Sequence, residues 1–249
     1  MNLTPEQYHL FRHNGFLKLP EQLPESLVDD LKRTILQHID ELVEPVMRDK
    51  HGRVIRISNL WDRGGVFQDA LTHPAVIEPL TSLLGPNIEF ILNRHNHATL
   101  RLADTSGGAM STETHRDVDQ WSRTIVTVLF YLEDTNLQNG CTYVVPGTHM
   151  LPGWSRRSAE IPNMDHDEEM VRSGLLAQRV PVPMPAGGLL AMDGMLFHAA
   201  GKNLTPNTRM SMTAGYHSVD EIAGARDPKR VVIRGNSSYY RGNLRRQEM

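Results

Sequence analysis

The sequence has a single cysteine and no long hydrophobic run, and each absence excludes a class of protein. One cysteine, Cys141, cannot form an internal disulfide and cannot supply a thiolate cage for zinc. Because no stretch of about 18 apolar residues is present, no transmembrane helix is expected. The first residues carry charges instead of an apolar segment, which argues against a signal peptide and favours the cytoplasm.

An excess of positive charge is also missing. The chain has 26 lysine and arginine residues against 29 acidic ones, for a formal net charge of -3, so no broad basic surface for nucleic acid is expected. Hydrophobic residues make up 39% of the 249 residues, which is enough for a real core. This length suits one large β-domain, and residues 1–249 are predicted to form a single domain.

The first 86 residues read mostly as helices that support the domain that follows. Thr4 can cap a helix that begins with Pro5 and ends at Gly15. Leucine and isoleucine at helical spacing predict a second helix, which Pro45 ends. The helices expected in this part span residues 4–14, 24–43 and 71–84, and a short strand is expected at 15–20.

From residue 87 to 235 the pattern changes to short segments rich in β-branched, aromatic and aliphatic residues, with turn residues between them. Helices followed by strands, without βαβ alternation, predict a mainly β fold, a β-sandwich or jelly-roll barrel with flanking helices. A polar insertion at 155–176 is expected to be a loop with one helix near the barrel mouth. The expected strands are IEFIL, HATLRL, TIVTVLFYL, TYVVP, QRVPVP, GGLLAM and MSMTAGYH.

His115 and Asp117 are candidates for metal binding. In an extended segment, residues two apart point to the same side, so both side chains can bind one ion. A His-x-Asp pair is weak evidence by itself, and His38 and Asp40 form a second one. That second pair lies in an expected helix, where residues two apart diverge, so we interpret it as solvated surface.

His198 is the best candidate for a third ligand, because it follows a strand and turn signal and is expected on a late strand that faces the barrel interior. Two histidines and one carboxylate on one face leave three octahedral positions open, which suits Fe(II) in an oxygenase. The alternative is that these histidines are ordinary polar residues of strands or of the surface.

Arg209 follows His198 after a turn, so the two can lie on adjacent antiparallel strands with both side chains inward. A buried arginine is unfavourable without an anionic partner, and its guanidinium matches a carboxylate in a bidentate way. A dicarboxylate cosubstrate, bound to the metal through its keto-acid end, would supply that partner. A surface arginine in a β-hairpin is the alternative.

These residues together resemble the phytanoyl-CoA dioxygenase family. The resemblance is carried by HRD at 115–117, NGCTYVVPGTH at 139–149, DGMLFHAAG at 193–201, Arg209 and the opening LTPEQYHLFRHNGFLKLP. It covers nearly the whole chain apart from the insertion and the tail, and it implies a double-stranded β-helix that uses Fe(II) and 2-oxoglutarate. By position, it implies that His115, Asp117 and His198 bind iron and that Arg209 binds the C5 carboxylate of 2-oxoglutarate.

The resemblance also suggests further cofactor and substrate contacts. Arg101 lies where a strand residue of the family often contacts the cosubstrate. Ala200 stands where some members have a serine that contacts 2-oxoglutarate, so Ser211 or Thr127 is expected to replace it. Trp121 corresponds to an aromatic residue that lines the pocket in some members, although a core or rim tryptophan is the alternative.

Reaction type and substrate class are harder to read. Asp117 argues against halogenation, because a small residue replaces it in the related halogenases; hydroxylation, oxidative cyclisation or epimerisation is favoured. Glu113, Asp119 and His97 are candidate substrate contacts, and the two acids would suit an amine-bearing, aminosugar-like molecule unless they are solvated loop residues. His95 and His97 leave a second metal site open.

Bacterial members of this size often tailor secondary metabolites, so the resemblance favours antibiotic biosynthesis, with a small-molecule substrate and dioxygen as partners. Two other classes remain: a hydroxylase that modifies a protein or peptide, and a non-catalytic β-barrel that binds a ligand.

Overall fold

The computed structural model describes residues 1–104, 114–117, 125–151, 174–219 and 229–236. Three residues singled out from the sequence, Glu113, Asp119 and Trp121, lie outside the described residues, as does most of the predicted insertion. Within the described ranges, no helix is long and apolar enough to cross a membrane.

The helices precede most of the strands. They are α1 (Pro5–Asn14), α2 (Glu25–Asp40), α3 (Gly65–Leu71) and α4 (Pro74–Leu84), with short 3-10 turns at Leu60–Arg63, Thr148–Met150 and Leu176–Gln178. Helix α1 confirms the predicted start and end. The Thr4 side chain accepts a hydrogen bond from the Gln7 N–H, the Gln7 side chain accepts one from the Thr4 N–H, and Gly15 ends the helix at φ +81°.

Two predicted helix boundaries were wrong. Helix α2 ends at Asp40, because Leu42 takes a left-handed conformation at φ +52° well before Pro45. The segment expected as one helix over 71–84 is divided between α3 and α4. Pro74 has no N–H and disfavours helical backbone in the residue before it, so α4 starts afresh there, with the His73 side chain accepting from the Ala75 N–H.

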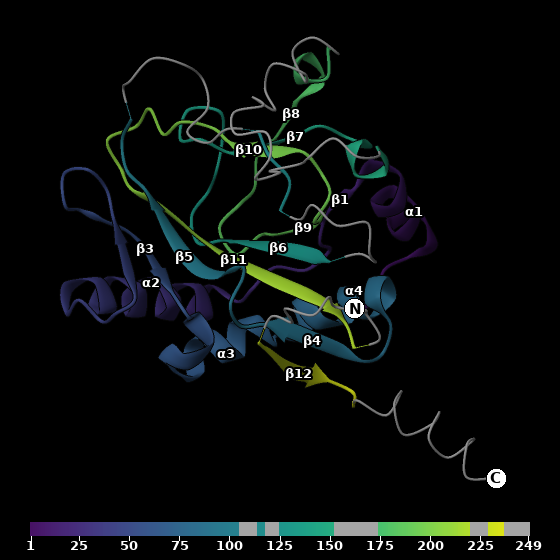
Figure 1. Ribbon diagram of the computed structural model, residues 1–249, viewed down its shortest axis with the longest axis horizontal. Coiled ribbons are helices and arrows are strands. Elements are labelled where there is room, and N and C mark those ends of the chain that lie inside the picture. Colours follow the sequence, from purple (N-terminus) through teal and green to yellow (C-terminus); the bar gives the residue numbers. More distant parts are fainter. Residues whose placement is uncertain (105–113, 118–124, 152–173, 220–228, 237–249) are drawn as a thin grey trace, which may run out of the picture.

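Two antiparallel sheets form the jelly-roll core, which confirms the predicted fold class (Figure 1). In the larger sheet the strand order is β1-β9-β6-β11-β5-β3-β2, and β4 pairs with both β11 and β12. Its strands are β1 (Phe16–Lys18), β2 (Val46–Arg48), β3 (Val54–Ser58), β4 (Ile88–Ile91), β5 (Asn96–Arg101), β6 (Val126–Tyr131), β9 (Leu189–Asp193), β11 (Arg209–Ser218) and β12 (Arg230–Arg234). The smaller sheet, in the order β10-β7-β8, contains β7 (Thr142–Val144), β8 (Val180–Val182) and β10 (His198–Ala200).

The N-terminal part does more than support the barrel with helices. Strands β1, β2 and β3 all precede residue 87, and all three belong to the nine-stranded sheet. Strand β3 pairs with β5, so Arg56 lies opposite Thr99 and Ser58 lies opposite His97. The N-terminal part therefore contributes side chains to the interior of the barrel.

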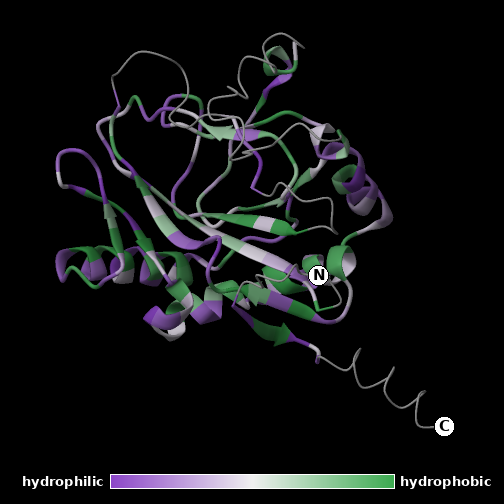
Figure 2. Cartoon of the chain, viewed as in Figure 1, coloured by the Kyte–Doolittle hydropathy of each residue, from purple (hydrophilic) through white to green (hydrophobic). Residues whose placement is uncertain are grey.

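Strand β11 shows how the large sheet separates core from cavity. Met210, Met212, Ala214 and Tyr216 belong to the main hydrophobic cluster, which also contains buried side chains of α2, α3 and α4. Side chains alternate along a strand, so Arg209, Ser211 and Thr213 face the other way, into a cavity. Figure 2 shows hydrophobic residues concentrated along α4 and the strands beside it.

Candidate metal centre and its cavity

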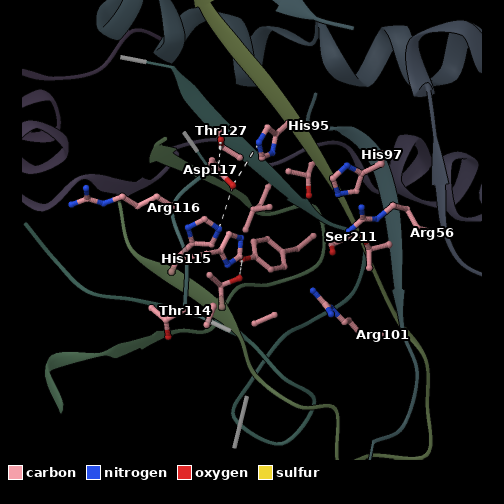
Figure 3. A pocket seen from close by; sticks show the side chains of 18 of the residues that line it. Arg56, His95, His97, Arg101, Thr114, His115, Arg116, Asp117, Thr127 and Ser211 are labelled. Carbon is pink, nitrogen blue, oxygen red and sulfur yellow. Dashed lines mark hydrogen bonds and ion pairs between the residues drawn. The ribbon is translucent and has the colours of Figure 1, made fainter. Parts of the chain in front are cut away.

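His115, Asp117 and His198 come together as predicted. Each offers one ligand atom, and these atoms all lie within 4.8 Å of one another. His198 Nε2 is 3.7 Å from Asp117 Oδ1, and the Asp117 carboxylate is buried while His115 is exposed. Figure 3 shows His115 and Asp117 among the side chains that line the pocket. In the part of the chain that the structure describes, no other group of three or more potential ligands forms such a cluster. His38 and Asp40, both on α2, are not part of it.

Backbone hydrogen bonds place the two histidines beside each other. The His115 N–H donates to the His198 carbonyl at 3.0 Å, and the His198 N–H donates back to the His115 carbonyl at 2.9 Å. Two residues further on, the Asp117 N–H donates to the Gly194 carbonyl at 2.9 Å. The 115–117 segment thus lies against β10 and the turn that precedes it, so the ligand spacing is set by main-chain pairing.

The ligand side chains are oriented for binding a cation. The Nδ1 of His198 lies 3.1 Å from the Leu196 carbonyl, which can only accept, so Nδ1 carries the proton and Nε2 keeps its lone pair. Burial alone would raise the pKa of Asp117, but His198 and His95, a hydrogen bond from Thr127 and finally His115 lower it to about 2. Asp117 is therefore a carboxylate at neutral pH.

Two arginines hold this segment through backbone carbonyls. Arg94 donates a short hydrogen bond to the Asp117 carbonyl. Arg116 donates to the carbonyls of Thr148 and Leu151 at 2.6 and 3.0 Å, and its guanidinium carbon lies 4.2 Å from the centre of the Phe197 ring. Both guanidinium groups thus hold backbone segments in place near the metal ligands.

The triad opens into a cavity of about 420 Å³ between the two sheets. Asp117 is the only carboxylate among the described residues that line it, whereas cationic and imidazole side chains are abundant. The arginines are Arg56, Arg94, Arg101, Arg116 and Arg209, and the histidines are His95, His97, His115 and His198.

Arg209 is the deepest of these cations. It is 3% exposed, and its buried Nε has no hydrogen-bond partner among the described residues. Burial lowers its pKa from the ordinary value of 12.5, and nearby Tyr131, Cys141 and Glu133 oppose that shift. In the β11–β5 register Arg209 lies opposite Arg101, whose pKa is lowered to about 10 by burial and by the charges of Arg209 and Arg56. A buried, unpaired cation of this kind fits the carboxylate of an anionic ligand.

The expected arrangement of His198 and Arg209 on adjacent strands was wrong. His198 is on β10, which pairs with β7 in the small sheet, whereas Arg209 is on β11 in the large sheet. The two residues instead line the same cavity from opposite sheets. This arrangement leaves the space between the metal ligands and the guanidinium open for a ligand that bridges them.

The other described candidates also lie on this cavity. Arg101, Ser211, Thr127 and His97 all line it, as does Ala200. The Thr127 hydroxyl is already engaged, since it donates to Asp117 Oδ2 at 2.6 Å. His97 is on β5, and its ring centre is 6.4 Å from that of His95, whose Nε2 is 3.6 Å from Asp117 Oδ1.

Sequence reasoning missed Arg56, which also lines the cavity. The available signal was the alternation in VIRIS, residues 54–58, directly after the turn-forming sequence DKHG at 49–52. His95 was singled out with His97 for an open second metal site, but its place 3.6 Å from Asp117 Oδ1 could not be predicted, because His95 itself takes a left-handed conformation at φ +51° just before β5.

The donor set and the buried cation fit an iron ion and 2-oxoglutarate. Two imidazoles and one carboxylate form the facial triad typical of non-haem Fe(II) oxygenases, and they leave open positions toward the cavity. Arg209 lies across the same cavity, where it can pair with the far carboxylate of a chelating keto acid.

Comparison with known proteins agrees with this fit. The model of the phytanoyl-CoA dioxygenase (PhyH) family matches residues 11–211. The dioxygenase af480 of Aspergillus fumigatus is 24% identical over 238 residues, which covers 89% of this chain and 69% of that protein.

Solved structures share the fold. The carbocyclase SnoK from nogalamycin biosynthesis has a TM-score of 0.74 at 18% identity, with 93% of this chain and 95% of that chain covered. The epimerase SnoN, in complex with Fe3+, α-ketoglutarate and nogalamycin RO, has a TM-score of 0.70 at 20% identity, with 93% and 94% covered. The chain therefore belongs to the phytanoyl-CoA dioxygenase family, and it is an Fe(II)- and 2-oxoglutarate-dependent dioxygenase.

Proposed function

We propose that the protein oxidises a C–H bond of a small, polar natural product, by hydroxylation or by an oxidative cyclisation or epimerisation. The observation that carries this proposal is the metal triad facing Arg209 across one cavity of about 420 Å³. A cavity of this size suits a small molecule. The carbocyclase and epimerase activities named for SnoK and SnoN support the same range of reactions and a role in antibiotic biosynthesis.

Each residue of the site has a separate role in this proposal. His115, Asp117 and His198 hold the iron, and Arg209, assisted by Arg101, holds the C5 carboxylate of 2-oxoglutarate. The bound iron and 2-oxoglutarate supply the oxidising chemistry with dioxygen. The chain itself fixes the distance between these groups, keeps the substrate C–H bond near the metal and limits the access of water.

Ser211 and Thr127 differ in what they can contribute to cosubstrate binding. Ser211 lies between the metal end and Arg209 on the inner face of β11, opposite Thr99 and Tyr131 in the flanking strands. Its hydroxyl is the better candidate for the serine contact that Ala200 cannot make. The Thr127 hydroxyl donates to Asp117, so its main role is to orient the metal ligand and not to bind 2-oxoglutarate.

The described lining favours an anionic or neutral substrate over an amine-bearing one. Asp117, the one carboxylate in that lining, is a metal ligand, and five arginines line the same cavity. Glu113 and Asp119, which motivated the aminosugar-like alternative, lie outside the described residues. A peptide substrate remains the second candidate, and substrate assays distinguish it from a small molecule.

Anaerobic spectroscopy followed by turnover assays tests the proposal. Addition of Fe(II) and 2-oxoglutarate to the folded protein is expected to produce the weak visible charge-transfer band of the chelate. Succinate formation is then expected to rise with a small-molecule panel and to stay at its basal rate with peptides. A missing band in folded protein contradicts the site assignment, and stimulation by peptides alone contradicts the substrate class.

A further inference from the structure

Arg56 is a cation in the cavity wall that has no hydrogen-bond or ion-pair partner among the described residues. It lies on β3 opposite Thr99 of β5, and it faces the cavity on the same side of the sheet as His97 (Figure 3). Its Nε is buried without a hydrogen-bond partner, and no carboxylate among the described residues forms an ion pair with it. A guanidinium placed in this way favours an anionic ligand.

The other arginines of the cavity have different roles. Arg94 and Arg116 donate to backbone carbonyls, as described above. Arg101 and Arg209 lie opposite each other in the β5–β11 register, so one carboxylate can contact both. Of the five arginines, Arg56 alone has neither a carbonyl partner nor a place opposite Arg209.

2-Oxoglutarate has nearer partners than Arg56. One end of this cosubstrate would chelate the metal, and its other carboxylate would pair with Arg209 and Arg101. Strand β3 is two strands away from β11 in the sheet, with β5 between them, so the backbones of Arg56 and Arg209 are separated by about 10 Å. Arg56 is therefore the guanidinium best placed for a second anion, and this step rests on the proposed function.

We propose that Arg56, with His97 beside it, binds an anionic group of the substrate, a carboxylate or a phosphate. The substrate is then a small anion whose charged end lies at β3 and β5 while its reacting carbon lies near the triad. His97 faces the same cavity from the neighbouring strand and offers a ring nitrogen to the bound group.

A second cavity indicates where the charged end enters. It has a volume of about 670 Å³, and Arg56, Thr99 and Arg101 line both cavities. The exposed Lys50 and His51, in the turn between β2 and β3, also line the second cavity. Its acids are paired, Asp49 with Arg53 at 2.7 Å and Asp104 with Lys202 at 3.5 Å. Among the described residues that line this cavity, Lys50, Arg56 and Arg101 therefore supply positive charge without a paired acid.

Four probes of one shape and different charge test the proposal: benzoate, phenyl phosphate, benzamide and benzylammonium. They are titrated by calorimetry into protein that is loaded with Zn(II), which accepts the same ligand types without turnover, and saturated with 2-oxoglutarate. Under these conditions Arg209 is occupied. Benzoate or phenyl phosphate is expected to bind about tenfold or more tightly than benzamide and benzylammonium. The comparison of the two anions identifies the preferred group.

Variants of Arg56 test whether this residue causes the tighter binding of the anionic probes. Arg56→Gln is expected to bind the anionic and the neutral probes equally. Arg56→Lys is expected to keep part of the difference, because lysine retains the positive charge. Arg48→Gln removes the same charge from the exposed face of the same hairpin, outside both cavities, and is expected to leave the difference unchanged. Circular dichroism of each variant confirms the fold.

Three results overturn the proposal: no tighter binding of either anion by the wild type, a preference that survives in Arg56→Gln, or an Arg56→Gln variant that loses 2-oxoglutarate as Arg209 variants do. The last is read from the Fe(II) and 2-oxoglutarate band, where Arg56→Gln is expected to change the dissociation constant by less than about twofold. Absence of that band in the wild type is instead the failure of the proposed function, and the comparison of Arg56→Gln with Arg48→Gln in Zn(II) protein still reports whether the anions bind at Arg56.

Discussion

Thr127 on β6 donates a 2.6 Å hydrogen bond to Oδ2 of Asp117, while Oδ1 of the same carboxylate faces His95 and His198. The hydroxyl therefore selects which carboxylate oxygen is presented to the metal. Hydrogen bonds of this kind orient metal ligands, and their loss weakens binding even though no ligand is removed.

Thr127→Val is expected to lower the affinity for Fe(II) by about 10- to 100-fold, because the isosteric valine cannot donate to Asp117. The measurement is an anaerobic Fe(II) titration followed by the charge-transfer band at saturating 2-oxoglutarate. Thr213→Val is the control, since Thr213 lines the same cavity from β11. Equal Fe(II) affinity in wild type and Thr127→Val would show that Asp117 is oriented by its backbone alone.

Arg209→Met is expected to weaken 2-oxoglutarate binding by about 100-fold or more, because it removes a buried, charge-assisted contact. The same variant is expected to raise the free energy of unfolding of the ligand-free protein by about 1 kcal/mol, since a nearly fully buried cation with an unpartnered Nε is replaced by an apolar side chain of similar volume. Urea denaturation with and without 2-oxoglutarate measures both effects. A variant that is less stable than the wild type without ligand contradicts the assignment of Arg209 as an unpaired cation.

His97 is expected to make stability depend on pH. Burial, followed by the charges of Arg56 and His95, lowers the pKa of His97 from its ordinary value of 6.5 to about 3, while Asp117 acts in the opposite direction. A histidine with a lowered pKa contributes stability that is fully present above pH 6.5 and is lost as pH falls toward 3. Between pH 7 and pH 5 the wild type should lose about 2 kcal/mol more than His97→Gln.

The experiment for His97 is urea denaturation of metal-free protein at both pH values. His51→Gln, at an exposed position on the β2–β3 turn, serves as the control and should follow the wild type. If His97→Gln loses as much stability as the wild type, His97 is not the group that takes up the proton.

Gly140 is expected to tolerate no side chain. Its φ of +83° is left-handed, and an added Cβ would overlap the carbonyl oxygen of Gly201, which directly follows β10 and lies three residues after His198. Gly140→Ala should therefore destabilise the fold by about 3 kcal/mol or more, from backbone strain and overlap together. Gly52→Ala, at φ +81° with open space around it, should lose only about 1–2 kcal/mol. If urea denaturation shows the same loss of unfolding free energy for Gly140→Ala and Gly52→Ala, the predicted overlap with Gly201 is wrong.

The local pattern of the sequence was enough to predict most of the barrel and the triad. Alternation, turn residues and the spacing of His115 and Asp117 are local properties, and each of the seven predicted strand segments coincides with an observed strand.

The pairing of strands could not be predicted in the same way. The turn between His198 and Arg209 suggested a hairpin, but the chain crosses there from the small sheet to the large one. Which sheet a short strand joins depends on contacts with segments far along the chain, such as the bridge from β10 to His115. Arg56 was missed for a related reason, because its place in the cavity depends on the pairing of β3 with β5, and residues 59–95 separate the two strands in the sequence.

Strand β11 serves the cavity and the core at once. One face carries Arg209, which we propose as the cosubstrate anchor, while the other packs Tyr216 and its neighbours into the hydrophobic interior. Strand β3, two places away in the sheet, has the same division on a smaller scale, with Arg56 toward the cavity and Ile57 in the core. Substitutions on the cavity face of either strand should therefore alter ligand preference, whereas substitutions at the alternate positions should reduce stability.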